Sequence, residues 1–404
     1  MADPFSAAKA GAKIPGTGTG PIPFDQDRLH LAMDNAHLDA VIVTSKVNVR
    51  YLTGGYNCIF FETMNELGIG QYGPTILYRK THPEHTLFLG SYFDKEQLPN
   101  DPIWIPNVDI SSWVHYSTIP LIIDWIKKEK LENSTIGLEY PFLAADIYMA
   151  LQSELPNVKW VDAVQPLEYV RAIKRPDELA ILRSASEKVV EAMLYGFRET
   201  KPGMSSRDIE KMVAHEERRL GLTFDYCLVG IGKDANRTPR DNIKFEAGMI
   251  MDFDSGGNIK GYIGDVCRMG SSGEPEPLQK QLLEEINHVQ MASRAPIKPG
   301  ARGGEIVDAG KKAIAECEHG SWMGYIAHGM GLVSHEAPRL VTKPIPYPNE
   351  WAERPLEAGM VVSIETTIAK PECGYVKLED TVSVTETGWE GFGDGGRSWN
   401  PIGS

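Results

Sequence analysis

The sequence contains no run of apolar residues long enough to cross a membrane, no phosphate-binding glycine loop and no internal repeat of short period. These absences argue against a membrane-spanning protein, a P-loop protein and a repeat protein. Basic residues are also in deficit, since 41 Lys and Arg against 55 Asp and Glu give a net charge of -14. We therefore expect no nucleic-acid or anionic-membrane partner, because binding to either would require a basic patch on the protein surface to neutralise phosphate charges.

Cysteine is scarce as well, and its pattern is uninformative for metal binding. The five cysteines are odd in number, widely separated and in no metal-ligand spacing: Cys58, Cys227, Cys267, Cys317 and Cys373. Such usage is typical of reduced thiols, so we expect a cytoplasmic protein.

What is present indicates two domains of an ordinary globular protein. A chain of 404 residues exceeds what one hydrophobic core usually organises. Residues 1–24 are rich in Ala, Gly, Pro and Thr and are expected to form a flexible arm. Strands and helices alternate over residues 25–165, which predicts an α/β layer domain. Residues 166–404 form the second domain. Its two long helices, the first starting at Pro176, are each followed by a Lys-Pro-Gly turn and another helix, which indicates two related halves.

The second domain contains an unusual acidic stretch between Gly248 and Gly270. An apolar run carries Asp252 and Asp254, and Asp265 follows in a second short run. We predict a strand, a tight turn at Ser255-Gly256-Gly257 and a second strand. Because an unpaired carboxylate in an apolar strand costs several kcal/mol, these aspartates require a compensating cation or proton. Two exposed aspartates near a turn are the simpler alternative.

Three later stretches carry the same kind of residue. His328 and His335 lie in IAHGMGLVSHEAP, Glu365 interrupts the apolar run of LEAGMVVSIETTI, and Glu379 lies in GYVKLEDTVSVTETG. Singly, each is explained as a core histidine or an exposed charge. Together, carboxylates and an imidazole beside β-rich runs are the donors that two divalent ions require. Such ions activate a water and stabilise charge on an attacked carbonyl.

These motifs, in this order, resemble the pita-bread superfamily of methionine aminopeptidase, prolidase and creatinase. The resemblance covers about residues 165–390, and the preceding domain is similar to the creatinase and prolidase amino-terminal domain. It implies an α/β (α+β) fold and a dinuclear site with two divalent ions, Mn, Fe, Co or Zn. The implied metal ligands are Asp254, Asp265, His328, Glu365 and Glu379. It also implies that Glu365 exchanges the catalytic proton and that His335 contacts the substrate.

Two positions depart from the pattern of the family peptidases. Those peptidases have a histidine seventeen residues before the first metal aspartate, and Arg237 stands there in this chain. Arginine cannot serve as a base, but it can hold a carboxylate. Asp252 is the second departure, and strand alternation puts it on the same face as Asp254. A dimethylsulfoniopropionate lyase branch of the superfamily has a similar D-x-D and also lacks the histidine. We therefore expect Arg237 and Asp252 to contact substrate.

The sequence thus predicts a metal-dependent hydrolase that resembles Xaa-Pro dipeptidases and aminopeptidases. A non-peptidase that cleaves a small charged metabolite, creatinase-like or lyase-like, is the main alternative, and a metal-free binding protein is a third. The expected partner is a short peptide or small molecule. A homodimer is also expected, because the segment with Tyr56, Phe60, Phe61 and Tyr72 is more apolar than a surface loop should be.

Overall fold

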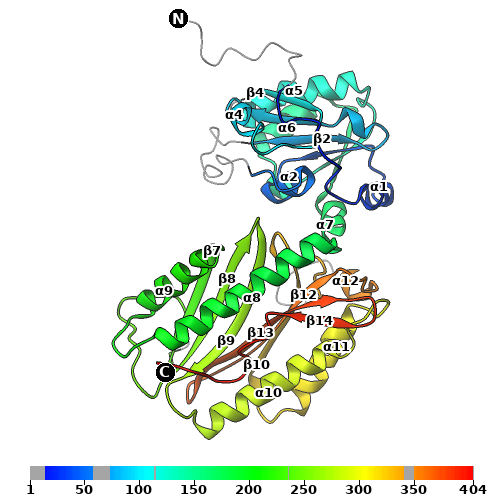
Figure 1. Ribbon diagram of the computed structural model, residues 1–404. Coiled ribbons are helices and arrows are strands. Elements are labelled where there is room, and N and C mark those ends of the chain that lie inside the picture. Colours follow the sequence, from blue (N-terminus) through cyan, green and yellow to red (C-terminus); the bar gives the residue numbers. More distant parts are fainter. Residues whose placement is uncertain (1–13, 58–72, 113–114, 235, 341–349, 404) are drawn as a thin grey trace, which may run out of the picture. The chain divides into compact units, whose positions relative to one another are not determined.

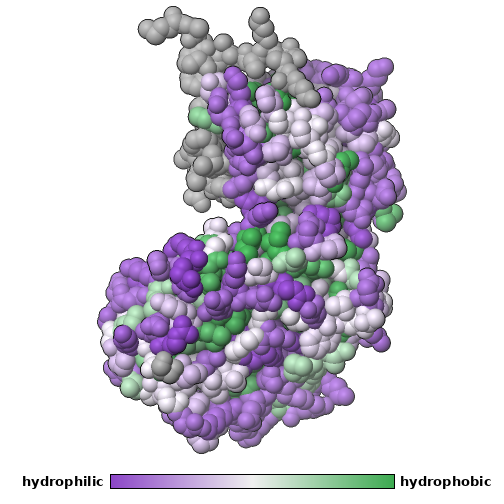
Figure 2. Space-filling view, viewed as in Figure 1, coloured by the Kyte–Doolittle hydropathy of each residue, from purple (hydrophilic) through white to green (hydrophobic). Residues whose placement is uncertain are grey.

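The computed structural model describes residues 14–57, 73–112, 115–234, 236–340 and 350–403. It divides into two compact units, Met1–Arg171 and Ala172–Ser404. On the face shown in Figure 2, hydrophilic residues predominate, as the acidic composition leads one to expect, and apolar side chains gather in smaller groups between them. Among the described residues, no helix is both long and apolar enough to span a bilayer.

The first unit is an α/β layer structure built on a six-stranded mixed sheet in the order β4-β3-β2-β1-β5-β6 (Figure 1). Apolar residues of the sheet and of α5 and α6 form its main core. The elements are α1 (Gln26–Asn35), β1 (Ala40–Val43), α2 (Lys46–Thr53), β2 (Thr75–Arg79), η2 (Pro83–His85), β3 (Leu87–Ser91), α4 (Asp94–Gln97), β4 (Asn107–Ser112), α5 (His115–Lys128), β5 (Thr135–Leu138), η3 (Tyr140–Phe142), α6 (Ala145–Glu154), β6 (Lys159–Asp162) and α7 (Val164–Ala172).

The expectation of a flexible arm needs correction, and three of the four aromatic residues named for the homodimer lie outside the described part of the chain. Residues 14–24, expected to belong to a flexible arm, pack on the unit: Thr17 pairs with Ile103, and Phe24 is buried against Tyr51. Tyr56, part of the apolar segment from which a homodimer is expected, is buried and donates its hydroxyl hydrogen to Asp94 within its own unit. Phe60, Phe61 and Tyr72 lie outside the described residues.

The second unit contains a nine-stranded sheet with α8 and α10 packed across its strands (Figure 1). The main path of the sheet runs β11-β10-β12-β13-β9-β8-β7; β14 pairs with β13, and β15 with β9. The elements are α8 (Pro176–Glu199), α9 (Ser206–Arg219), β7 (Thr223–Ile231), β8 (Ile250–Ile259), β9 (Tyr262–Ser271), α10 (Pro277–Arg294), α11 (Gly304–Glu316), η4 (Gly320–Trp322), β10 (Met323–Met330), β11 (Ser334–Glu336), α12 (Glu350–Glu353), β12 (Val361–Lys370), β13 (Gly374–Val384), β14 (Trp389–Phe392) and β15 (Asn400–Pro401).

The second unit repeats one order of elements. Two helices, α8 and α9, precede β7, β8 and β9, and the helices α10 and α11 precede β10, β12 and β13. The predicted helix start at Pro176 is confirmed, and Ser205 caps α9 by accepting a hydrogen bond from the backbone of Asp208. The predicted α/β class and its two related halves are therefore present.

The predicted hairpin is also present, but its turn is not at Ser255-Gly256-Gly257. The turn lies at Lys260 and Gly261, both with positive φ, between paired residues Ile259 and Tyr262. Gly256 and Gly257 are inside β8, paired with Asp265 and Gly264, and a Cβ at Gly256 would lie 2.4 Å from the Tyr226 ring. These glycines therefore serve close packing rather than a reversal of the chain.

Candidate metal centre

Strand register brings acidic residues of three strands into one row that crosses four strands of the sheet. Glu365 on β12 pairs with Glu379 on β13. Glu379 in turn pairs with Cys267 on β9, which pairs with Asp254 on β8. Residues far apart in the sequence are thus neighbours because their strands are adjacent.

The other two predicted ligands lie in the next row on the same face. Asp265 is two residues before Cys267 on β9, and His328 on β10 pairs with Ser363, which is two residues before Glu365. Side chains two residues apart in a strand point to one side of the sheet. The five predicted ligands therefore converge on one side.

The distances within this cluster would allow a divalent ion to bind. One ligand atom each from Asp254, Asp265 and Glu379 lie within 4.8 Å of one another, and the same holds for His328, His335 and Glu365. His328 Nε2 is buried and lies 3.7 Å from Glu365 and 3.8 Å from Glu379, too far for hydrogen bonds. A buried imidazole nitrogen aimed at carboxylates, with no hydrogen-bond partner among the described residues, fits a divalent ion.

Buried carboxylates so close together perturb one another. Burial and the charges of Glu379 and Asp254 raise the pKa of Asp265 well above its usual value. Burial and the charge of Glu379 also raise the pKa of Glu365. Burial raises the pKa of Glu379 too, but the nearby Lys377 and His328 outweigh it and lower that pKa. The cluster thus needs positive charge to remain ionised.

Part of that charge comes from Lys377, which the sequence analysis did not assign a role. Its Nζ lies 2.6 Å from Asp254, 2.7 Å from Glu365 and 2.7 Å from Glu379. Lys377 precedes Glu379 by two residues on β13, so strand alternation within the KLED motif was the signal that could have identified it.

Arg237 supplies the second buried cation. Its Nε lies 2.7 Å from Asp252 and its Nη2 lies 2.8 Å from Asp254, while its guanidinium lies 4.3 Å from the centre of the Tyr375 ring. The Asp252 carboxylate is only 1% exposed. Asp252 and Asp254 share one face, as alternation predicts, and the structure brings Arg237 onto both of them.

Three hydroxyl groups orient the candidate ligands. Tyr226 and Ser334 both donate to Asp265, the latter at 2.9 Å, and Ser363 donates to Glu379 at 2.9 Å. Ligand carboxylates held in this way keep their direction in the absence of an ion. Ser363 lies two residues before Glu365 and was open to prediction, whereas Tyr226 and Ser334 come from other strands.

His335 lies against this group rather than within the carboxylate row. Its ring stacks on that of His328, with centroids 3.7 Å apart and planes 10° apart. Burial and the nearby charge of His328 lower the pKa of His335 to about 4. Its φ of 65° is unusual for a residue other than glycine and is typical of strained positions at functional sites.

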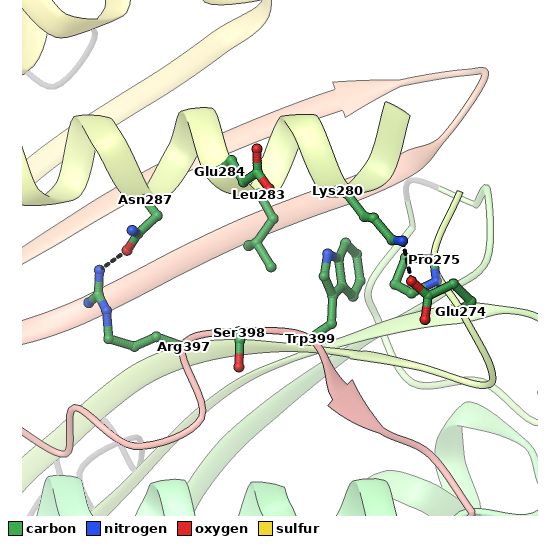
Figure 3. Close-up of a pocket in the computed structure, with 9 residues that line it drawn as sticks. All are labelled: Glu274, Pro275, Lys280, Leu283, Glu284, Asn287, Arg397, Ser398 and Trp399. Carbon is green, nitrogen blue, oxygen red and sulfur yellow. Dashed lines mark hydrogen bonds and ion pairs between the residues drawn. The ribbon is translucent and has the colours of Figure 1, made fainter. Parts of the chain in front are cut away.

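A separate cavity of about 660 Å³ lies between α10 and the segment from Arg397 to Trp399. Figure 3 shows Leu283 and Trp399 facing each other across it, with Arg397 bonded to Asn287 at one end. None of the candidate ligands lines this cavity.

Comparison with known proteins agrees with the geometry. Residues 180–386 match the metallopeptidase family M24, and residues 26–173 match the creatinase/prolidase N-terminal domain. Similar proteins include the uncharacterized peptidase YqhT of Bacillus subtilis, 24% identical over 87% of this chain and 92% of the relative. The Xaa-Pro dipeptidase of Pyrococcus horikoshii is 25% identical over 88% of this chain and 93% of its own length. A solved structure of a Xaa-Pro dipeptidase from Bacillus anthracis superposes with a TM-score of 0.77 at 22% identity, covering 93% of this chain and 99% of that one.

The fold and these matches define an enzyme, a metal-dependent hydrolase. The chain belongs to the metallopeptidase family M24, within the pita-bread superfamily of methionine aminopeptidase, prolidase and creatinase.

Proposed function

We propose that the chain is a dinuclear metal-dependent hydrolase that cleaves Xaa-Pro dipeptides or short Xaa-Pro peptides. The observation that carries this proposal is the convergence of Asp254, Asp265, His328, Glu365 and Glu379 on one face of the sheet. The similarity to Xaa-Pro dipeptidases supports the substrate class. The donor set fits Mn, Fe, Co or Zn alike.

In this proposal the five residues would hold two divalent ions. When bound, such ions activate a water and polarise the amide carbonyl. Glu365 exchanges the proton, because its side chain is 14% exposed, more than that of Glu379, and its pKa is raised by burial and by Glu379.

His335 is the substrate-contacting residue of the proposal. Because its pKa is about 4, its imidazole is neutral at pH 7 and offers one donor and one acceptor. Both suit an amide or a peptide carboxyl group. The stacked ring of His328 fixes its plane.

A specialised non-peptidase is the second candidate. Arg237 in place of the family histidine, paired with Asp252, favours it, since a proton-transferring imidazole has become a fixed cation. In this candidate Arg237 and Asp252 contact a small charged substrate. Against it stands the engagement of Arg237 by two protein carboxylates, which leaves few of its donors for a substrate.

A substrate panel with metal analysis separates the candidates. We expect two ions per chain by mass spectrometry of the purified protein, and hydrolysis of Xaa-Pro dipeptides that chelation abolishes and Mn, Fe, Co or Zn restores. Matched dipeptides without proline serve as controls. Turnover of creatine-like amides, cyclic amidines or dimethylsulfoniopropionate, with none of Xaa-Pro peptides, would select the second candidate. Activity that survives thorough chelation would contradict both.

We also propose a cytoplasmic homodimer. The four described cysteines are unpaired, which supports a reducing compartment. Exposed Tyr140, Phe142 and Met149 on the first unit are apolar groups of the kind that contact a second subunit.

A further inference from the structure

Lys377 makes contacts that the metal-ligand scheme does not require. An ammonium group has three N–H donors and no acceptor. Three carboxylates of the candidate centre, from Asp254, Glu365 and Glu379, lie 2.6 to 2.7 Å from its Nζ. Its Nζ donates a hydrogen bond to Asp254 and forms ion pairs with Glu365 and Glu379, so its charged contacts are with metal-ligand candidates.

The charge balance of the centre explains why such a residue is needed. Five carboxylates meet there: those of Asp252, Asp254, Asp265, Glu365 and Glu379. Arg237 and Lys377 contribute two positive charges, so the formal charge of these seven side chains is -3. Without Lys377 this formal charge would be -4. Lys377 is only 4% exposed, so water screens these charges little.

Asp254 shows how closely the two cations share the ligand set. Arg237 and Lys377 both donate to the same atom, Asp254 Oδ2, at 2.8 and 2.6 Å. This arrangement leaves Oδ1 for a metal ion. It also fixes the direction of the carboxylate before any ion arrives.

We propose that Lys377 is a resident cation of the metal centre: it holds three ligand carboxylates together when no metal ion is bound, and it competes with the incoming ion for them. The proposal rests on the metal site proposed above. Lys377 is thus a positioning residue, because it acts through Asp254, Glu365 and Glu379. Because of Lys377, the second unit stays folded without metal, and its metal affinity is lower than the carboxylates alone would provide.

The test compares Lys377→Met, which keeps length without charge, with Lys377→Arg, which keeps the charge. Lys298→Met, at an exposed lysine of the same unit, is the matched control. Melting temperature is measured with Mn²⁺ and after chelation, and Mn²⁺ affinity by competition with a chromophoric chelator, starting from loaded protein. Neither readout depends on activity.

For Lys377→Met we expect the metal-free melting temperature to fall by about 10 °C, since breaking a buried charge cluster is costly. The metal-loaded form should fall by less, and Mn²⁺ should bind about tenfold more tightly, because a like charge near the ion is gone. Unfolding of the variant on chelation, with the wild type still folded, also supports the proposal. Lys377→Arg and Lys298→Met should remain near wild type.

Two results would overturn the proposal. One is weaker Mn²⁺ binding by Lys377→Met, which would show that Lys377 promotes metal binding rather than competing with the ion for the carboxylates. The other is an equal fall of both melting temperatures, or an equal fall for Lys377→Arg, which would make charge irrelevant. If the wild type itself binds no Mn²⁺, Fe²⁺, Co²⁺ or Zn²⁺, the metal site proposed above fails instead.

Discussion

The pair formed by Arg237 and Asp252 offers a quantitative test of how this centre differs from that of family peptidases. The Arg237 side chain is 10% exposed, and its Nε lies 2.7 Å from Asp252. Replacing Arg237 with Met leaves Asp252 buried and unpaired, whereas Asp254 keeps Lys377. Breaking a buried ion pair from one side costs about 3 to 5 kcal/mol. For a unit of this size we expect a fall in melting temperature of about 10 °C.

A double-mutant cycle isolates the pair. Asp252→Asn keeps the shape and removes the charge, so the double variant Arg237→Met/Asp252→Asn should be more stable than the sum of the single losses by about 2 kcal/mol. Calorimetry of the full chain measures this coupling free energy, and the unfolding transition that shifts should be that of the second unit, Ala172–Ser404. Arg240→Met, at an exposed arginine three residues along, is the control.

The outcome decides what Arg237 does. Suppose that Arg237→Met is as stable as the wild type and only raises KM for the substrate that the enzyme hydrolyses. The guanidinium then binds substrate rather than stabilising Asp252, and the reasoning from the buried pair is refuted. A stability loss with positive coupling shows that Arg237 stabilises the fold through its ion pair with Asp252.

Three further predictions concern metal, pH and assembly. Glu379→Ala should lower bound metal and abolish activity without unfolding the first unit, whereas exposed Glu372→Ala should change neither; metal analysis and calorimetry check this, and full metal content in Glu379→Ala would contradict it. Burial raises the pKa of Glu217 from 4.5 to about 7. The unfolded chain therefore loses this proton first, and the contribution of Glu217 to stability, full below about pH 4.5, declines by about 3 kcal/mol as pH rises to about 7. Glu217→Gln should remove that decline in urea titrations across this range, and an unchanged pH dependence would show that Glu217 is ionised in the folded state. Light scattering at micromolar concentration should show a dimer, and a fully active monomer would exclude it.

Features that depend on neighbouring residues in the sequence were predicted correctly from strand alternation and helix-start signals. Strand alternation placed Asp252 and Asp254 on one face, and the proline and acidic residues at Pro176 located the start of α8. The same alternation, applied to the KLED motif, would have placed Lys377 beside Glu379. These features depend on residues two to four positions apart, whose geometry the backbone sets.

The sequence by itself therefore determined the fold class, the membership in a metal-dependent family and the residue types of the centre. The tertiary structure decided which groups neutralise one another. The hairpin turns at Lys260-Gly261, and Gly256 lies inside β8 with Tyr226 from another strand packed on it. Arg237 meets Asp252 and Asp254, rather than only a substrate, because β7 and β8 are adjacent and the chain beyond β7 returns beside them. Such pairings join residues separated along the chain, and only strand order and register bring their charges within contact distance.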